Sequence, residues 1–400
     1  MNRISEYVKQ SMKLALSVAL PVLVSSVGGC GSSDTPSTPA PPPAATTKID
    51  TDGVSPCKIN TGFAGDEICI AAPAADKGFQ FHYGPADYTN AAEVAKYTLH
   101  PGQEVTDCVF FPTPNDQDVY FNSYHSRMRP GSHHMLLYIQ NSMVTETGPN
   151  DGPRACAQGA DTRNLFGAQT PTLDVDGNVD NAPENQGFAI KVPAHQQAVM
   201  QLHFINAGTT DILREAWANI LFVDKSQVTQ LGDPIFFIAG VTMNVTMGTT
   251  TTIHGTAKVP ATAGPDYRLV NATPHYHTHT TKFTAWATIN GQKQVFLEDF
   301  PTLGKLPEPL LTSFDSVAQN KAPNESARLG GASSGILAMK PGDQIDWECV
   351  VENNNVSSSS PAPFKAAAIT FDNAVYTGEM CNLFGTYAPS TGGAWSAPNL

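Results

Sequence analysis

The sequence predicts an all-β protein with two core-forming domains. Its 400 residues are about two to three times the usual length of a single domain. Only 15% of the residues are charged, compared with about 25% in an average globular protein, which argues against coiled coils and long helices. The 32 glycines and 31 prolines suit a chain of short strands joined by many turns.

The net charge excludes one class of partner. With 23 Lys and Arg against 36 Asp and Glu, the chain carries −13 at pH 7. A chain this acidic repels nucleic-acid phosphates and anionic lipid surfaces. We therefore expect no nucleic-acid partner.

Residues 1–29 have the pattern of a signal peptide. A basic segment precedes the apolar run Leu14 to Val27, which is too short to span a bilayer. Gly28 and Gly29 stand directly before Cys30, which resembles a bacterial lipobox. We expect Cys30 to be lipidated and to anchor the chain in the cell envelope, facing the periplasm or on the outer-membrane surface. The alternative is an ordinary secretory signal with a chance cysteine.

Residues 30–55 predict a flexible linker. The stretch from Gly31 to Asp50 is rich in Pro, Ser and Thr, and such a tether holds a domain away from a surface. Removal of residues 1–29 would take away three basic and one acidic side chain, so the exported chain would carry −15.

The remaining six cysteines predict disulfide bonds, because an exported chain with an even number of cysteines favours them over free thiols. Cys349 and Cys381 are the only two in the second half, so we expect them to pair. The first four allow three connectivities. The one we prefer joins Cys57 to Cys69 and Cys108 to Cys156.

Beyond the linker, short apolar runs broken by Gly, Pro, Asn and Asp predict strands. Asn290-Gly291 predicts a type I′ turn between a strand ending at Ile289 and one at Gln294–Glu298. The polar stretch Asp224–Gly232 predicts a boundary between domains at 56–225 and 226–400. The expected strands are Glu104–Phe111, Met135–Gln140, Ala198–Asn206, Trp217–Val223, Pro234–Val241, His275–Ile289, Gln344–Val351 and Ala366–Tyr376.

The histidine pattern predicts metal chemistry. In His275-x-His277-x-His279 the side chains would share one face of a strand, about 6–7 Å apart, and could converge on one ion. The alternative is a set of half-exposed histidines on a solvated sheet. His133 and His134 would point opposite ways on a regular strand, so both bind one metal only if a bulge or strand end rotates one of them.

Four motifs follow one another along the chain: Gly131–Tyr138, Met200–Phe204, His277–His279 and Glu379–Leu383. This series resembles the copper type II, ascorbate-dependent monooxygenases, the family of peptidylglycine α-hydroxylating and dopamine β-monooxygenases. The resemblance extends from Gly102 to Tyr387, and the stretches between the motifs are only loosely similar. It implies two tandem antiparallel jelly-roll β-sandwich domains, each with one copper, following the lipoprotein signal and the Pro-rich tether.

The resemblance further implies two separate copper sites, an electron-storing one and an oxygen-activating one. A thioether ligand favours Cu(I), which suits the site that binds O₂. Cys349 matches the family's partner for Cys381, so this disulfide would pin the strand that carries the thioether. The implied ligands are His133, His134 and His203, with Gln201 beside them, for the first copper, and His277, His279 and Met380 for the second.

The resemblance implies hydroxylation of a C–H bond of a small organic substrate by O₂, with electrons from an external reductant such as ascorbate. The residues expected to contact the substrate differ from the family pattern. His275 replaces an arginine that grips a peptide carboxylate, and Phe384 replaces a tyrosine, although Asn382 is retained. A glycine-extended peptide is therefore not the expected substrate. His275 could serve as a spare copper ligand, hydrogen-bond the substrate or face solvent, and we expect it to face solvent or to lie behind the ligands.

Two other functions fit the sequence. A non-catalytic surface lipoprotein that binds copper for storage, delivery or sensing would suit the His/Met residues, the acidic charge and the anchor equally well. Two different ligand sets in two domains argue against it. A jelly-roll adhesion or carbohydrate-binding module with fortuitous histidines is the third reading. The histidines without motif context, expected to be ordinary surface or core residues, are His82, His100, His125, His195 and His254.

Overall fold

The computed structural model describes residues 57, 59–140, 163–168, 171–175, 187–260, 267–299, 337–353, 367–372, 377–390 and 395–398. All of them belong to one compact unit, residues 47–400. The signal segment, Cys30, the linker and Cys156 lie outside the described residues. Among the helices that the structure describes, none has the length and apolar character needed to cross a membrane.

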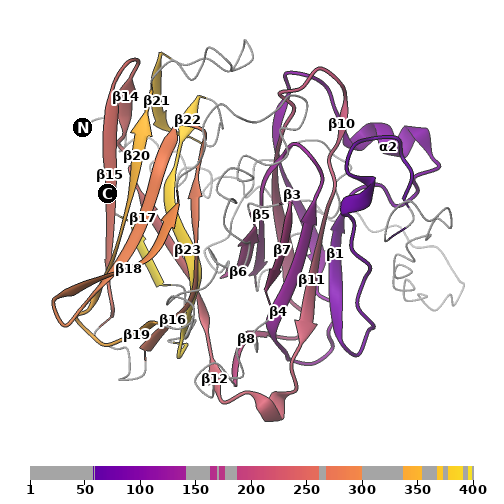
Figure 1. Cartoon of the computed structure of the whole chain (residues 1–400). Helices are drawn as coiled ribbons and strands as arrows, with labels where there is room; N and C mark the ends of the chain where they lie inside the picture. Colours follow the sequence, from indigo (N-terminus) through magenta and orange to yellow (C-terminus); the bar gives the residue numbers. More distant parts are fainter. Residues whose placement is uncertain are drawn as a thin grey trace, which may run out of the picture. The chain divides into compact units, whose positions relative to one another are not determined.

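The described chain is almost entirely β-structure (Figure 1). We call residues 57–231 the N lobe and residues 233–398 the C lobe. The N-lobe elements are η1 (Asp66–Ile68), β1 (Gly78–Tyr83), α2 (Ala91–Tyr97), β2 (Thr98–Leu99), β3 (Glu104–Pro112), β4 (Val119–Met128), β5 (Ser132–Gln140), β6 (Arg163–Ala168), β7 (Thr172–Val175), β8 (Phe188–Val192), β9 (Gln197–Ile205), β10 (Ile212–Leu213), β11 (Ala216–Phe222), η4 (Lys225–Gln227) and β12 (Gln230–Leu231).

The C lobe is also built from short strands. They are β13 (Asp233–Ala239), β14 (Asn244–Thr246), β15 (Thr250–Lys258), β16 (Tyr267–Tyr276), β17 (Thr280–Ile289), β18 (Gln292–Asp299), β19 (Leu337–Met339), β20 (Gln344–Glu352), β21 (Ala368–Phe371), β22 (Gly378–Glu379), β23 (Cys381–Ala388) and β24 (Trp395–Pro398).

Both lobes have jelly-roll strand order. The N lobe pairs the sheet β1-β11-β4-β8 with the sheet β3-β9-β5-β6. The C lobe pairs β13-β23-β16-β19 with β15-β20-β17-β18. If the eight strands named in each lobe are counted in chain order, both lobes read 1-8-3-6 and 2-7-4-5, the double Greek key of a jelly roll. The predicted all-β jelly-roll class is therefore confirmed.

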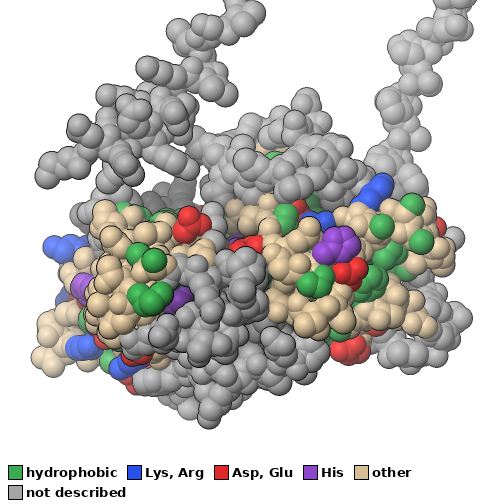
Figure 2. Space-filling model, turned by 90° about the horizontal axis from the view of Figure 1, so that it is seen from above, with side chains coloured by type: hydrophobic (Ala, Val, Ile, Leu, Met, Phe, Trp, Pro, Cys, Tyr) green, Lys and Arg blue, Asp and Glu red, His purple; other side chains and the backbone are tan. Residues whose placement is uncertain are grey.

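Each lobe has its own hydrophobic core, because alternate residues of its strands point between its two sheets. The N-lobe core includes Phe121, Leu202 and Phe204, and the C-lobe core includes Phe237 and Trp347. All five side chains are fully buried. On the face drawn in Figure 2, the described acidic and basic side chains lie scattered among polar and hydrophobic ones.

A third, smaller apolar cluster joins the lobes. It combines residues of β3, β5 and β9 from the N lobe with Phe384 of β23, and Phe236 of β13 packs against it. We call it the interlobe layer. Its buried members are Cys108, Phe110, Leu136, Tyr138, Val199 and Phe384. The N-lobe sheet β3-β9-β5-β6 therefore faces the C-lobe sheet that contains β13, β16 and β23.

Most predicted strands match observed ones within one to three residues. The hairpin is confirmed: Asn290 and Gly291 have φ values of 51° and 78° and join β17 to β18. The expected strand His275–Ile289 is wrong, because β16 ends at Tyr276 and β17 begins at Thr280. The expected strand Ala366–Tyr376 is shortened to β21, and residues 373–376 lie outside the described part.

The structure confirms two predicted disulfides, Cys57–Cys69 and Cys349–Cys381. The second links β20 to β23, which belong to opposite sheets of the C lobe. Cys108 is also disulfide-bonded, while its expected partner, Cys156, is outside the described residues.

Candidate metal centre

A β-bulge brings His133 and His134 to the same side of their strand. In the pairing of β5 with β9, Ser132 lies opposite Phe204 and His134 opposite His203, so His133 is the extra residue at the register shift. The rings of His133 and His134 have centroids 5.1 Å apart, and His133 lies equally close to His203. The bulge that this pair of neighbours required is therefore present.

His277 and His279 lie in the turn between β16 and β17, where Thr280 N–H donates to His277 O at 3.4 Å. Strand alternation is thus not what orients them. The fully buried carboxylate of Glu379 accepts hydrogen bonds from the backbone N–H groups of His277, His279 and Met380, the last two at 3.0 and 2.8 Å. This carboxylate satisfies the turn's buried donors and ties both histidines to the residue that precedes Met380.

Five imidazoles from both lobes form one buried group, the histidine cluster: His133, His134, His203, His275 and His277. All are buried, with at most 5% exposure. The ring centroid of His133 lies 4.7 Å from that of His277 and 5.4 Å from that of His275. His275 also lies 5.1 Å from His134 and 5.6 Å from His277.

The structure therefore differs from the two separate pockets expected from the sequence. The interlobe layer explains the difference, because it packs the sheet that carries His133, His134 and His203 against the sheet that carries His275. His275 itself does not face solvent: it is 1% exposed, and its Nε2 lies 3.2 Å from the Sδ of Met380. His279 is buried beside β20, with Nδ1 3.3 Å from Glu352 O.

Hydrogen bonds select the nitrogen that each N-lobe histidine presents. His203 Nε2 lies 2.7 Å from Glu104 Oε1, and His134 Nε2 lies 3.2 Å from Gln201 Oε1. Because these oxygens are acceptors, Nε2 carries the proton and Nδ1 keeps the lone pair. The Nδ1 atoms of His134 and His203 are buried and have no hydrogen-bond partner among the described residues.

The histidines of the β16–β17 turn present the opposite nitrogen. His277 Nδ1 lies 3.4 Å from Gly378 O, and His279 Nδ1 lies 3.3 Å from Glu352 O. Donation to a backbone carbonyl leaves the lone pair on Nε2. Such contacts behind the ring are typical of metal-binding histidines, because they fix the tautomer and the ring orientation.

Burial keeps three of these imidazoles neutral. It lowers the pKa of His133, His134 and His275 well below the ordinary imidazole value of 6.5, and the neighbouring imidazoles lower it further. A neutral imidazole is the form that binds a metal. At pH 7 these side chains need release no proton to become ligands.

The donor set fits copper. His133, His134 and His275 each offer a ligand atom, and these atoms lie within 4.8 Å of one another. Imidazole suits Cu, Zn, Fe and Ni, whereas the thioether of Met380, which touches His275, is a soft donor that favours Cu(I). Buried nitrogens that lack a partner are the groups that a bound cation would satisfy.

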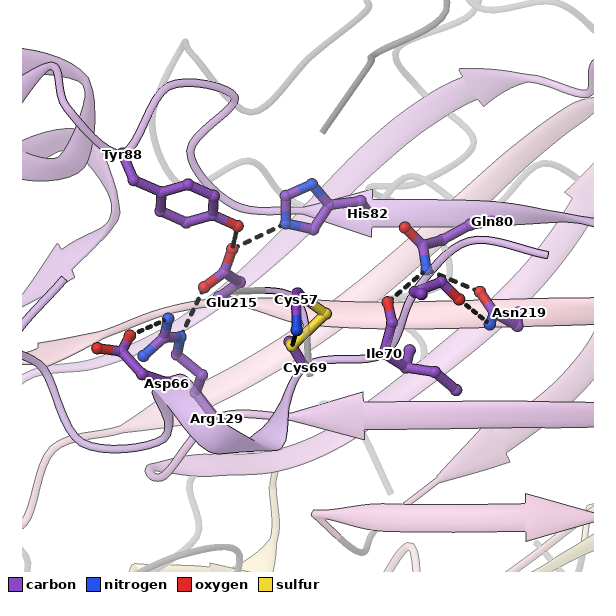
Figure 3. The surroundings of a disulfide bond; sticks show 11 residues. Cys57, Asp66, Cys69, Ile70, Gln80, His82, Tyr88, Arg129, Glu215 and Asn219 are labelled. Atoms are coloured by element: carbon purple, nitrogen blue, oxygen red, sulfur yellow. Dashed lines mark hydrogen bonds and ion pairs between the residues drawn. A yellow bond between two sulfur atoms is a disulfide. The ribbon is translucent and has the colours of Figure 1, made fainter. Parts of the chain in front are cut away.

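A buried ionic network, which sequence reasoning missed, anchors the start of β5 (Figure 3). The Arg129 guanidinium, fully buried, donates to Glu215 at 2.6 Å and to Asp66 at 2.7 Å. Glu215 also accepts hydrogen bonds from His82 and Tyr88. The Cys57–Cys69 disulfide closes the loop that carries Asp66.

This network fixes the backbone that leads from Arg129 to His133 and His134. Gly131 has φ of 88°, and a Cβ there would lie 2.9 Å from Ile205 O, so only glycine fits. Ser132 Oγ donates to Arg129 O at 2.8 Å. The one feature of the sequence that could have pointed to this network was Arg129, four residues before His133.

Aromatic side chains border the cluster on the C-lobe side. The ring of Phe384 lies 5.2 Å from that of His275 and stacks on Phe236 at 4.9 Å. Nearby, a cavity of about 10 Å³ is lined by Phe384, Phe166, Tyr124 and four further residues. A space of this size holds no more than a single water.

Comparison with known proteins identifies no family. No family model matches the chain, and no curated protein matches its sequence. Solved structures with some similarity include the major capsid protein P2 of bacteriophage PM2, at 10% identity and TM-score 0.27, covering 79% of this chain and all of that one. A triple jelly-roll protein of an archaeal virus has 8% identity and TM-score 0.18, covering 74% of this chain and 61% of that one. Scores this low support no conclusion for this chain.

Proposed function

We propose that this protein is a copper-dependent monooxygenase that hydroxylates a C–H bond of a small organic substrate with O₂ and an external reductant such as ascorbate. One observation carries the proposal. Five buried imidazoles and the sulfur of Met380 converge between two jelly-roll lobes, with the lone pairs of His134 and His203 unsatisfied. The resemblance of the four sequence motifs to the copper type II monooxygenases agrees with it.

Bound copper would supply the redox chemistry by taking electrons from the reductant and passing them to O₂. The chain's own residues would hold the imidazoles in place and exclude water. Glu104 and Gln201 orient the N-lobe rings. Glu379 fixes the turn that carries His277 and His279.

The surroundings of His275 favour an apolar substrate. Its described neighbours on the C-lobe side include the ring of Phe384, the sulfur of Met380 and Asn382, which lies opposite it on β23. None of these three side chains carries the positive charge that grips a carboxylate in a bidentate pair. We propose a small substrate without a carboxylate at the reacting end.

The envelope location is a separate proposal. Lipidation of Cys30 would anchor the chain through the linker of residues 30–55, and the disulfides in the described part agree with an oxidising compartment. Replacement of Cys30 by Ser should move the protein from the membrane fraction to the soluble fraction. An unchanged membrane fraction would contradict lipidation.

The activity is tested by loading the purified protein with copper and measuring O₂ uptake with ascorbate and a panel of small apolar substrates. We expect substrate-dependent uptake that falls at least tenfold in Met380→Ala. Met247→Ala is the matched control, since Met247 is 50% exposed. Bound copper without coupled uptake on any substrate would contradict the proposal.

A second candidate is a non-catalytic copper-binding lipoprotein. The burial of the five imidazoles, each at most 5% exposed, favours it, because a buried site can hold an ion without giving an organic substrate access. A storage or delivery protein would bind and release copper with no dependence of O₂ uptake on substrate. The same uptake experiment separates the two functions.

A further inference from the structure

We propose that His133, His134 and His275 bind one metal ion that joins the two lobes. The sequence resemblance assigned His133 and His134 to a site completed by His203 and did not place His275 in that site. The identity of the ion as copper rests on the proposed function, whereas the site itself rests on geometry alone.

The three ligand atoms are already close enough to share an ion. They lie within 4.8 Å of one another, and imidazole nitrogens bound to a first-row metal lie about 2 Å from it, so two of them are at most about 4 Å apart. Rotation of the rings supplies the remaining shift of about 1 Å or less. The bulge at His133 points both N-lobe rings at His275.

The hydrogen bonds of His275 assign its binding nitrogen. Its Nε2 faces the Sδ of Met380 at 3.2 Å, and a thioether sulfur acts as a weak acceptor, so the proton belongs on Nε2. Its Nδ1 is buried without a hydrogen-bond partner among the described residues, and so is Nδ1 of His134. An ion between them would satisfy both atoms.

Such an ion would connect elements far apart in the chain. His133 and His134 belong to β5 of the N lobe, and His275 belongs to β16 of the C lobe. Because the ion binds the folded, joined lobes and not the separated ones, its binding free energy would stabilise the contact between them. The metal ion and the interlobe layer would then both stabilise the contact between the lobes.

The first test compares two matched variants loaded with Cu(II), His275→Gln and His203→Gln. We expect His275→Gln to weaken copper binding at least tenfold, and His203→Gln to weaken it less. His254→Gln is the control, because His254 is half exposed on β15. Circular dichroism confirms that each variant folds. Wild-type affinity in His275→Gln, or a larger loss in His203→Gln, would overturn the proposal.

The second test needs no variant. Hydrogen exchange of the full chain with and without Zn(II) should show added protection both at residues 131–140 and at residues 267–276. Protection confined to the first segment would overturn the proposal. These readouts do not involve turnover, so a failed O₂-uptake assay with intact binding by His275 would contradict only the proposed function.

Discussion

The imidazole ring of His133, in the N lobe, has its centroid 4.7 Å from that of His277, which follows β16 of the C lobe. The two rings lie nearly perpendicular, at 78°. Histidines separated by more than 140 residues in the sequence therefore belong to one buried cluster. Any change that separates the lobes should also disturb metal binding.

The first prediction concerns the carboxylate behind His203. Glu104→Ala removes the oxygen that lies 2.7 Å from His203 Nε2. Loss of such an orienting partner typically costs about 10- to 100-fold in metal affinity. Competition with a chelator should show a loss toward the lower end of this range and smaller than the loss in His275→Gln, because His203 lies beside the three-histidine site and is not one of its ligands. Glu67→Ala, at an exposed position, should bind copper like the wild type, and equal affinity in both variants would refute the orienting role of Glu104.

The second prediction concerns pH. The lowered pKa values of His133, His134 and His275 mean that, below about pH 6.5, the unfolded chain binds protons that the folded chain does not. The free energy of unfolding of the chelator-treated protein should therefore fall as the pH drops below 6.5. Urea unfolding at pH 7.5, 6.5 and 5.5 measures it.

Glu379 contributes with the opposite sign. Burial raises the pKa of its carboxyl to about 7, so between about pH 4.5 and 7 the folded chain holds a proton that the unfolded chain releases. This contribution grows as the pH falls through 7 and partly offsets the three histidines. Glu379→Gln should make the acid loss of stability steeper, and a shallower loss would contradict the assignment.

The third prediction concerns the disulfide that links β20 to β23. Replacement of Cys349 and Cys381 by Ala opens a loop closed across 32 residues of sequence, which in the chain-entropy model costs about 3–4 kcal/mol of unfolding free energy. Chemical denaturation measures this loss. Because Met380 directly precedes Cys381, the double variant should also bind Cu(I) more weakly, and unchanged Cu(I) affinity would show that the disulfide does not position the thioether.

The fourth prediction concerns the interlobe layer. Phe384→Ala removes a 6% exposed ring that stacks on Phe236, and burial losses of this kind cost about 3–5 kcal/mol. Urea unfolding should show this loss. It should also reveal two transitions where the wild type has one, since the lobes would lose their shared contact. Val295→Ala, half exposed, should change stability by less than about 0.5 kcal/mol.

Local features of the fold could be predicted from the sequence. Strand runs such as Gln344–Val351 and the Asn290-Gly291 turn depend on residues close in the chain. The pair Cys349–Cys381 followed from cysteine position, whereas Cys57–Cys69 belonged to the preferred one of three connectivities that the sequence left open. The sequence also indicated that His133 and His134 could bind one metal only if a bulge or a strand end rotated one of them. It could not show that the bulge exists.

The features that were missed depend on packing between distant segments. His275 lies among ligands only because the C-lobe sheet meets the N-lobe sheet across the interlobe layer. Glu379 and Arg129 are buried ionisable side chains whose partners come from other strands and loops. No spacing along one strand reveals such contacts, and strand alternation gave the wrong reason for the orientation of His277 and His279.

Anomalous diffraction from a crystal of the copper-loaded full chain, recorded at the copper absorption edge, tests the central claim most directly. The account predicts a peak inside the histidine cluster, about 2 Å from imidazole nitrogens of His133, His134 and His275. Copper found only at exposed histidines such as His100, with no peak in the cluster, would contradict it.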